Sequence, residues 1–109
     1  MASLGGRPFA RHLKVIDWLK GELASALGAV LRAMAAGTED GLAWALASLV
    51  LTAYVLGRRV GVSYSRLDGR VVGRARDLIA QGHELERTYG DLSALVAHFG
   101  ERGSQDGPT

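Results

Sequence analysis

One uncharged segment, 41–57, constrains more than any other what this chain can fold into. Its sequence is GLAWALASLVLTAYVLG, seventeen residues without a charge between Asp40 and Arg58. A segment of this kind is typical either of a short membrane span or of the most buried helix in a small bundle. As a helix it would extend roughly 25 Å, somewhat less than the roughly 30 Å hydrocarbon core of a bilayer.

The segments on either side have amphipathic patterns. Between Phe9 and Ala36 the apolar residues recur at three- and four-residue steps, which is the period of an α-helix. Gly21 interrupts this run, so the pattern leaves open whether it forms one helix or two. Further apolar stripes follow in 65–89 and 92–99. Amphipathic helices need a partner for their apolar faces, and a helix that is apolar all round is the natural one.

These patterns favour 41–57 as the buried core helix of a protein that does not bind a membrane. The alternative is a small single-span membrane protein, in which Arg58 and Arg59 would form the cytoplasmic anchor. No signal peptide is recognised, and we therefore expect a cytoplasmic location. Cysteine is absent, which excludes disulfides, thiolate metal sites and cysteine nucleophiles.

Turn signals divide the chain into helices, and no segment reads convincingly as a strand. Gly37 suits a left-handed helix end and Thr38 suits an N-cap, and the two acidic residues that follow fall in a first turn, where negative charge suits the helix dipole. A turn this tight predicts two antiparallel helices. Further helix starts are indicated at Ser63 or Ser65 and just after Gly90. We therefore predict an all-α bundle of about four to five helices, completed by oligomerisation.

The length and composition are those of one small domain. The chain has 109 residues and only two prolines, both near its ends, so nothing between them forces a helix to break. The predicted domain covers 9–100. The polar, glycine-rich segments 1–8 and 101–109 are predicted to be flexible tails.

A row of arginines is the most distinctive charged feature. Arg66, Arg70 and Arg74 are spaced four residues apart and share one face of the third predicted helix. The row indicates either a solvated face or a cradle for the phosphates of a nucleotide. Nucleic acid is not an expected partner, because the net charge is only +2 and no interleaved aromatic residue or binding motif accompanies the arginines. The three histidines lie far apart and predict no metal site.

Three segments together point to a family. KVIDWLKGEL (14–23), LGRRVGVSYSRLD (56–68) and GHELERTYGDLSAL (82–95) follow one another at a characteristic spacing. In this order they resemble the short MazG-like proteins of bacteria, which are related to the all-α nucleoside triphosphate pyrophosphohydrolases. The resemblance implies a helical-bundle subunit that assembles with others. For catalytic members it implies Mg²⁺ held by E-x-x-E on one helix and E-x-x-D on the next, where the ion bridges nucleotide phosphates while water attacks.

The acidic pattern is missing from this chain. Ala45 and Ser48 stand where the resemblance places the E-x-x-D acids, and Glu22 has Leu19 and Ser25 as its neighbours three residues away. Uncharged side chains cannot neutralise a divalent ion. We therefore predict a non-catalytic MazG-like oligomer that acts by binding a protein or a nucleotide and uses no cofactor.

An active enzyme is the alternative. It would be an Mg²⁺-dependent nucleoside triphosphate pyrophosphohydrolase with an atypical acidic site, assembled from Asp17, Glu22, Glu39 and Asp40. Only the fold can show whether these four carboxylates meet.

Small residues form a stripe along the uncharged segment. Gly41, Ala45, Ser48 and Thr52 share one helical face. Small side chains let two helix backbones approach closely, so the stripe is a predicted seam, either within the subunit or between the copies of a homodimer.

Overall fold

The structure is a computed structural model that describes the backbone of residues 2–105 and the side chains of residues 11–102. Within this part of the chain there are five helices and no strand, which confirms the predicted all-α fold. The helices are α1 (Ala2–Ala36), α2 (Glu39–Arg59), α3 (Tyr64–Ala80), the π-helix η1 (Leu85–Tyr89) and α4 (Asp91–Gln105).

The chain divides into two compact units, Met1–Tyr64 and Ser65–Thr109, which are described separately below. The single domain over 9–100 stays a prediction. Helix extends into both predicted tails, because α1 begins at Ala2 and α4 ends at Gln105. Residue 1 and residues 106–109 of those tails lie outside the described part of the chain.

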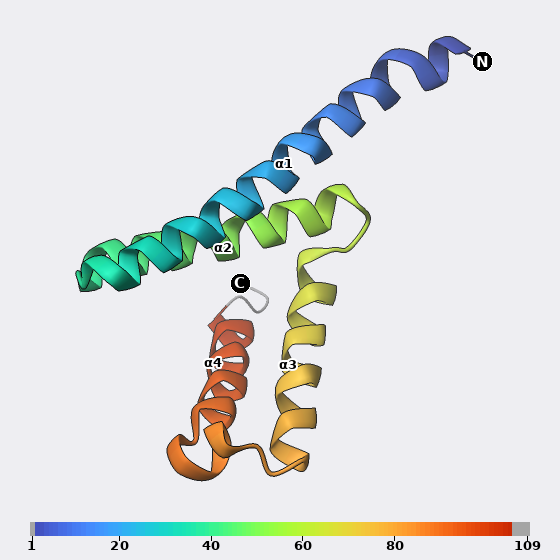
Figure 1. Cartoon of the computed structure of the whole chain (residues 1–109). Helices are drawn as coiled ribbons and strands as arrows, with labels where there is room; N and C mark the ends of the chain where they lie inside the picture. The colour runs from blue at the N-terminus through green and yellow to red at the C-terminus, as the bar shows by residue number, and fades with distance from the viewer. Residues whose placement is uncertain (1, 106–109) are drawn as a thin grey trace. The chain divides into compact units, whose positions relative to one another are not determined.

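Unit 1 is a helical hairpin. α1 continues through Gly21 without a break, so the segment is one helix rather than two. It ends at Gly37, whose φ of 79° is the left-handed conformation that glycine adopts without steric cost. After this turn α2 runs back beside the C-terminal part of α1, as the antiparallel prediction requires (Figure 1).

Thr38 occupies the N-cap position of α2 but does not cap it with its side chain. Its backbone is extended, with φ −94° and ψ 130°, as expected for an N-cap residue. The hydroxyl makes no hydrogen bond to the first turn, so the expected side-chain cap is absent. Glu39 and Asp40 lie in that turn as predicted, and their charges complement the partial positive charge of the helix start.

The seam of the hairpin is built from small and medium apolar side chains. Leu19, Ala26 and Val30 are buried on α1, and Ala45 is buried on α2. The α1 residues are spaced seven and four residues apart, which places them on one helical face. Alanine on both helices leaves little side-chain bulk between the two backbones at this seam.

Within unit 1, segment 41–57 is not the fully buried core helix that the sequence predicts. Ala45 is the one buried residue of α2, whereas Trp44 is 77% exposed and Leu51 is 65% exposed. The reason is geometric, because unit 1 contains only α1 to cover α2 and one neighbour shields one face. By length and composition α2 could cross a membrane, which is weak evidence by itself, and 6% of its most apolar stretch is buried.

Unit 2 contains α3, η1 and α4. α3 begins at Tyr64, directly after Ser63, one of the two predicted N-cap positions. η1 ends at Gly90, which has a φ of 68°, and α4 then runs back beside α3 (Figure 1). Among the described side chains of this unit, 65–102, Ala75 on α3 and Leu92 on α4 are buried.

Candidate functional site

A groove runs between α1 and α2 in unit 1, and we call it the α1–α2 groove. Its volume is about 520 Å³, within the range of small-ligand sites. Apolar side chains and the rim residue Trp18 form most of its walls. Its polar side chains are Glu22, Ser25 and Arg32 from α1, with Ser48 and Thr52 from α2.

The hydroxyl groups on the α2 side are bound to their own helix. Ser48 Oγ donates a hydrogen bond to the Trp44 carbonyl at 3.0 Å, and Thr52 Oγ1 donates to the Ser48 carbonyl at 2.8 Å. Bonds of this kind to the carbonyl four residues earlier let polar residues occur in an apolar helix. Ser48 and Thr52 are uncharged, and the other α2 residues that line the groove are apolar, so the α2 wall is neutral.

The α1 side carries one charge of each sign. Glu22 is half-buried in the groove wall. Arg32 lies back against its own helix, since a Cβ at Gly28 would be 3.1 Å from Arg32 Nη1. Glu22 is the one carboxylate among the residues that line this groove.

The acids of the alternative active site do not come together in the described chain. Asp17 forms an exposed ion pair with Lys20 at 3.4 Å. Glu39 and Asp40 are exposed in the first turn of α2. Among the described residues no group of three or more His, Cys, Asp or Glu side chains is placed to hold a metal ion. One carboxylate with neutral hydroxyls does not fit the set of acids, E-x-x-E with E-x-x-D, that the Mg²⁺ site of a catalytic relative would need.

The predicted small-residue stripe lies on the α1 side of α2. Ala45 is buried in the hairpin, and Gly41, Ser48 and Thr52 are half-buried. A Cβ at Gly41 would lie 2.6 Å from Thr38 Oγ1, so glycine at this position leaves space for the Thr38 hydroxyl. The stripe therefore forms part of the seam and groove wall within the subunit.

The arginine row is exposed on α3, and two of its members share a groove. Arg70 and Arg74 lie at the rim of a groove of about 360 Å³ in unit 2, whereas Arg66 does not line it. The other lining residues are apolar: Val71, Ala75, Leu78, Leu92 and Leu95. The helical spacing of the arginines is visible in the sequence, whereas the apolar surface beside Arg70 and Arg74 is not.

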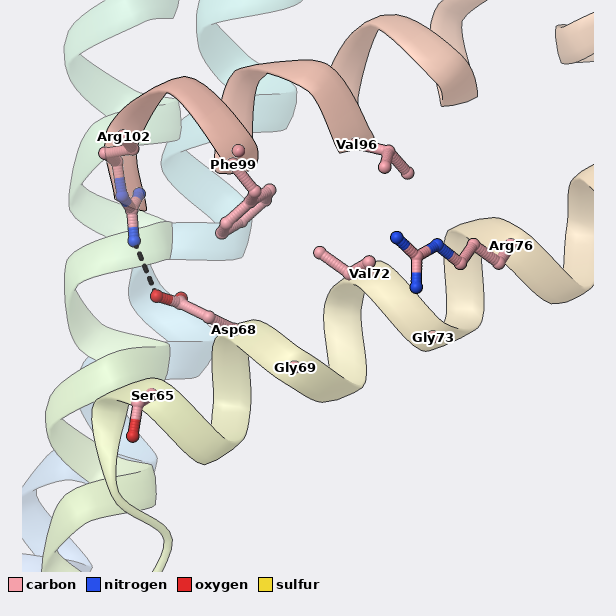
Figure 2. A pocket seen from close by; sticks show the side chains of 10 residues that line it. Ser65, Asp68, Gly69, Val72, Gly73, Arg76, Val96, Phe99 and Arg102 are labelled. Carbon is pink, nitrogen blue, oxygen red and sulfur yellow. Dashed lines mark hydrogen bonds and ion pairs between the residues drawn. The ribbon is translucent and has the colours of Figure 1, made fainter. Parts of the chain in front are cut away.

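A further groove in unit 2 was missed by the sequence reasoning. It lies between α3 and α4, and we call it the α3–α4 groove (Figure 2). Its α3 wall contains Asp68, Val72 and Arg76 at four-residue steps, and this spacing was the available signal. Nothing in the local sequence reveals the second wall, because α4 follows much later in the chain.

Comparison with known proteins decides the family. A model of the MazG-like family matches residues 9–92. The chain belongs to the MazG-like family. The match begins in α1, includes all of α2, α3 and η1, and ends at the start of α4, so it extends from unit 1 into unit 2 of this MazG-like protein. It also includes Glu22, Ala45 and Ser48. No curated protein and no solved structure matches the chain.

Proposed function

We propose that this protein is a non-catalytic MazG-like subunit that acts by binding and pairs with a second copy through its α1–α2 hairpin. The observation that carries the proposal is the composition of the α1–α2 groove. Its one carboxylate, Glu22, shares the groove with Ser48 and Thr52. Hydrolytic relatives would need E-x-x-E and E-x-x-D acids on the corresponding helices.

The electrostatics of the groove oppose catalysis by bound metal ions. Phosphoryl-group chemistry of this class uses divalent ions to neutralise developing charge and position water. Glu22 supplies one negative charge, and Arg32 places a positive charge in the same groove. A like-charged guanidinium raises the cost of holding a cation there. The groove suits a neutral or anionic ligand better than a metal cluster.

Exposed apolar side chains support assembly through the hairpin. On α1, Leu27, Leu31 and Met34 are exposed and share one face, and on α2 Trp44 and Leu51 do the same. Burying the exposed part of each would contribute roughly 1–2 kcal/mol, since fully burying such a side chain contributes roughly 1.5–3 kcal/mol and these are already partly covered. Two hairpins joined about a twofold axis would form a four-helix bundle and cover these faces.

The test is sedimentation velocity on protein purified without detergent. We expect a dimer at micromolar concentration, and Trp44→Glu with Leu51→Glu should convert it to monomer. Tyr89→Glu is the matched control, because Tyr89 is 71% exposed on η1 and lies outside the hairpin. A monomeric parent protein would contradict the proposal. Recovery only in detergent would instead identify α2 as a membrane span.

A nucleotide is the second candidate ligand, favoured by the position of Arg70 and Arg74 above an apolar groove. Guanidinium groups pair well with phosphate oxygens, and the apolar surface could hold a base. Nucleotide affinity should fall at least about tenfold in Arg70→Gln and Arg74→Gln. Arg87→Gln makes the same charge change on η1, away from the groove, and should keep the parent affinity.

A further inference from the structure

The α3–α4 groove has a size and composition suited to a small ligand. Its volume is about 500 Å³, which lies within the range of known small-molecule sites. Val72 on α3 and Val96 and Phe99 on α4 form its apolar walls (Figure 2). Charged side chains stand at its ends, so apolar and ionic recognition are both offered along its length.

The floor of the groove is helix backbone without side chains. Gly69 and Gly73 line it one turn apart on α3, and a Cβ built on either would meet no atom within 4 Å. A Cβ at either position would therefore occupy open space that now belongs to the groove. Glycine is unfavourable inside a helix by about 1 kcal/mol relative to alanine, so the open floor is kept at a cost in helix stability.

The charged side chains at one end of the groove pair with each other, whereas Arg76 stands at the other end. Asp68 and Arg102 form an ion pair at 2.8 Å, and the guanidinium carbon of Arg102 lies 4.8 Å from the centre of the Phe99 ring. Arg76 stands farther along α3, and Figure 2 shows its guanidinium reaching back beside Val72. Among the described side chains no carboxylate forms an ion pair with Arg76. Two arginines and one aspartate leave the groove with one positive charge.

We propose that the α3–α4 groove binds a small organic anion. Its carboxylate or phosphate group pairs with Arg76, and its apolar or aromatic body lies against Val72, Val96 and Phe99. Asp68 and Arg102 neutralise each other at one end of the groove, so its excess positive charge lies at Arg76, and the anionic end of the ligand pairs there. An inorganic anion lacks the body that the apolar walls recognise, and a neutral analogue lacks the partner for Arg76. This site is separate from the α1–α2 groove and from the arginine row.

The experiment is an amide NMR titration of the full-length protein with phenylbutyrate, phenyl phosphate, phenylbutanol and inorganic phosphate. Gly69, Gly73 and Gly100 line the groove, so the NMR signals of their backbone amides report on its occupancy. We expect saturable shifts of these amides with phenylbutyrate, with phenyl phosphate or with both, and the two organic arms distinguish carboxylate from phosphate recognition. Phenylbutanol and inorganic phosphate should bind at least about tenfold more weakly, since each lacks one of the two recognised parts.

Variants separate this site from general binding to apolar surface. Arg76→Gln should weaken phenylbutyrate binding at least about tenfold, and Arg76→Lys should restore part of it. Gly73→Leu should abolish binding by filling the floor, and Gly69→Leu gives a second blocking variant should Gly73→Leu misfold. Arg87→Gln should leave the affinity within about twofold.

Three results would overturn the proposal. They are equal binding of phenylbutanol, parent-like affinity of Arg76→Gln, and shifts confined to the exposed face of α2. Unchanged phenylbutyrate binding in the folded Gly69→Leu or Gly73→Leu variant would overturn it as well. None of these results depends on whether the protein dimerises or hydrolyses nucleotides.

Discussion

Asp68 Oδ2 accepts a hydrogen bond from Arg102 Nη2 at 2.8 Å, and this ion pair links the early part of α3 to the last turn of α4. Both side chains are partly exposed, so solvent screens the pair and its contribution to stability is moderate. The pair joins residues far apart in the sequence, and it therefore helps to hold α4 against α3 within unit 2.

Removing this pair should loosen unit 2. We expect Asp68→Asn to lower the free energy of unfolding by about 1 kcal/mol, because a partly exposed charge-assisted bond is lost. Urea denaturation followed by helical circular dichroism measures the change. Asp77→Asn, an exposed α3 aspartate outside the groove, is the control and should change stability by less than about 0.5 kcal/mol. Equal effects of the two variants would show that the ion pair contributes nothing specific.

The start of α4 should be sensitive to acid. Glu86 accepts a hydrogen bond from the Ser93 hydroxyl and another from the Ser93 backbone N–H, the latter at 2.9 Å. These bonds hold the pKa of Glu86 below its ordinary value of 4.5, the side-chain bond having the larger effect. A lowered folded-state pKa means that the stabilisation is present above about pH 4.5 and is lost as the pH falls through the lower folded-state value.

Amide hydrogen exchange in the first turn of α4 measures this effect. Exchange, corrected for its intrinsic pH dependence, should become faster as the pH falls below 4.5 in the parent protein. Glu86→Gln should remove most of this dependence, and Ser93→Ala should reduce it. Glu84→Gln, a neighbouring exposed carboxylate, should keep the parent profile. A parent-like profile in Glu86→Gln would disprove the assignment.

The hairpin seam should tolerate charge at Ser48 better than at Ala45. Ala45 is 5% exposed, so Ala45→Arg would bury an unpaired charge or separate the helices. We expect it to destabilise the protein by about 3 kcal/mol or more. Ser48→Arg should cost less, because Ser48 lines an open groove through which a long side chain can reach water. Thermal unfolding compares the two, and the reverse order would argue against this placement of the seam.

The protein should not hydrolyse nucleoside triphosphates to monophosphate and pyrophosphate at an enzyme-like rate. Glu22 offers too little negative charge in the α1–α2 groove for Mg²⁺ or Mn²⁺ to exchange bulk water for protein ligands. Pyrophosphate release from standard and modified triphosphates is the measurement, with Glu22→Gln as the control for contaminating activity. Turnover in the parent that disappears in Glu22→Gln would contradict the prediction and show that Glu22 forms a metal site with carboxylates from outside the α1–α2 groove.

Helix boundaries could be predicted where local residues decide them. Gly37 and Gly90 end helical segments because glycine adopts the left-handed backbone that stops a helix, and no distant contact is needed. The sequence leaves the continuity of α1 through Gly21 open, and the structure has one helix there, because one helical glycine costs only about 1 kcal/mol and the rest of the segment is strongly helical. The side-chain cap expected of Thr38 is not formed, because residue type alone does not decide the direction of a hydroxyl.

The candidate sites could be predicted only in part. The family resemblance is confirmed, and the absence of carboxylates from 41–57 can be read from residue identities alone. Arg70 and Arg74 were found from their helical spacing, but the apolar groove beneath them includes leucines from α4. The α3–α4 groove was missed for the same reason, because Arg76 and Phe99 belong to different helices.

The sequence by itself determined that the chain is helical, where most helices end, and which helix lacks the family's acids. These properties depend on residue identity and on interactions within a few residues. The tertiary structure decided which faces are covered, and within unit 1 it leaves Trp44 exposed while it buries Ala45. Periodicity shows that a face is apolar but not which distant helix will pack on it. Burial and grooves are properties of two surfaces together, so they emerge only when both surfaces are placed.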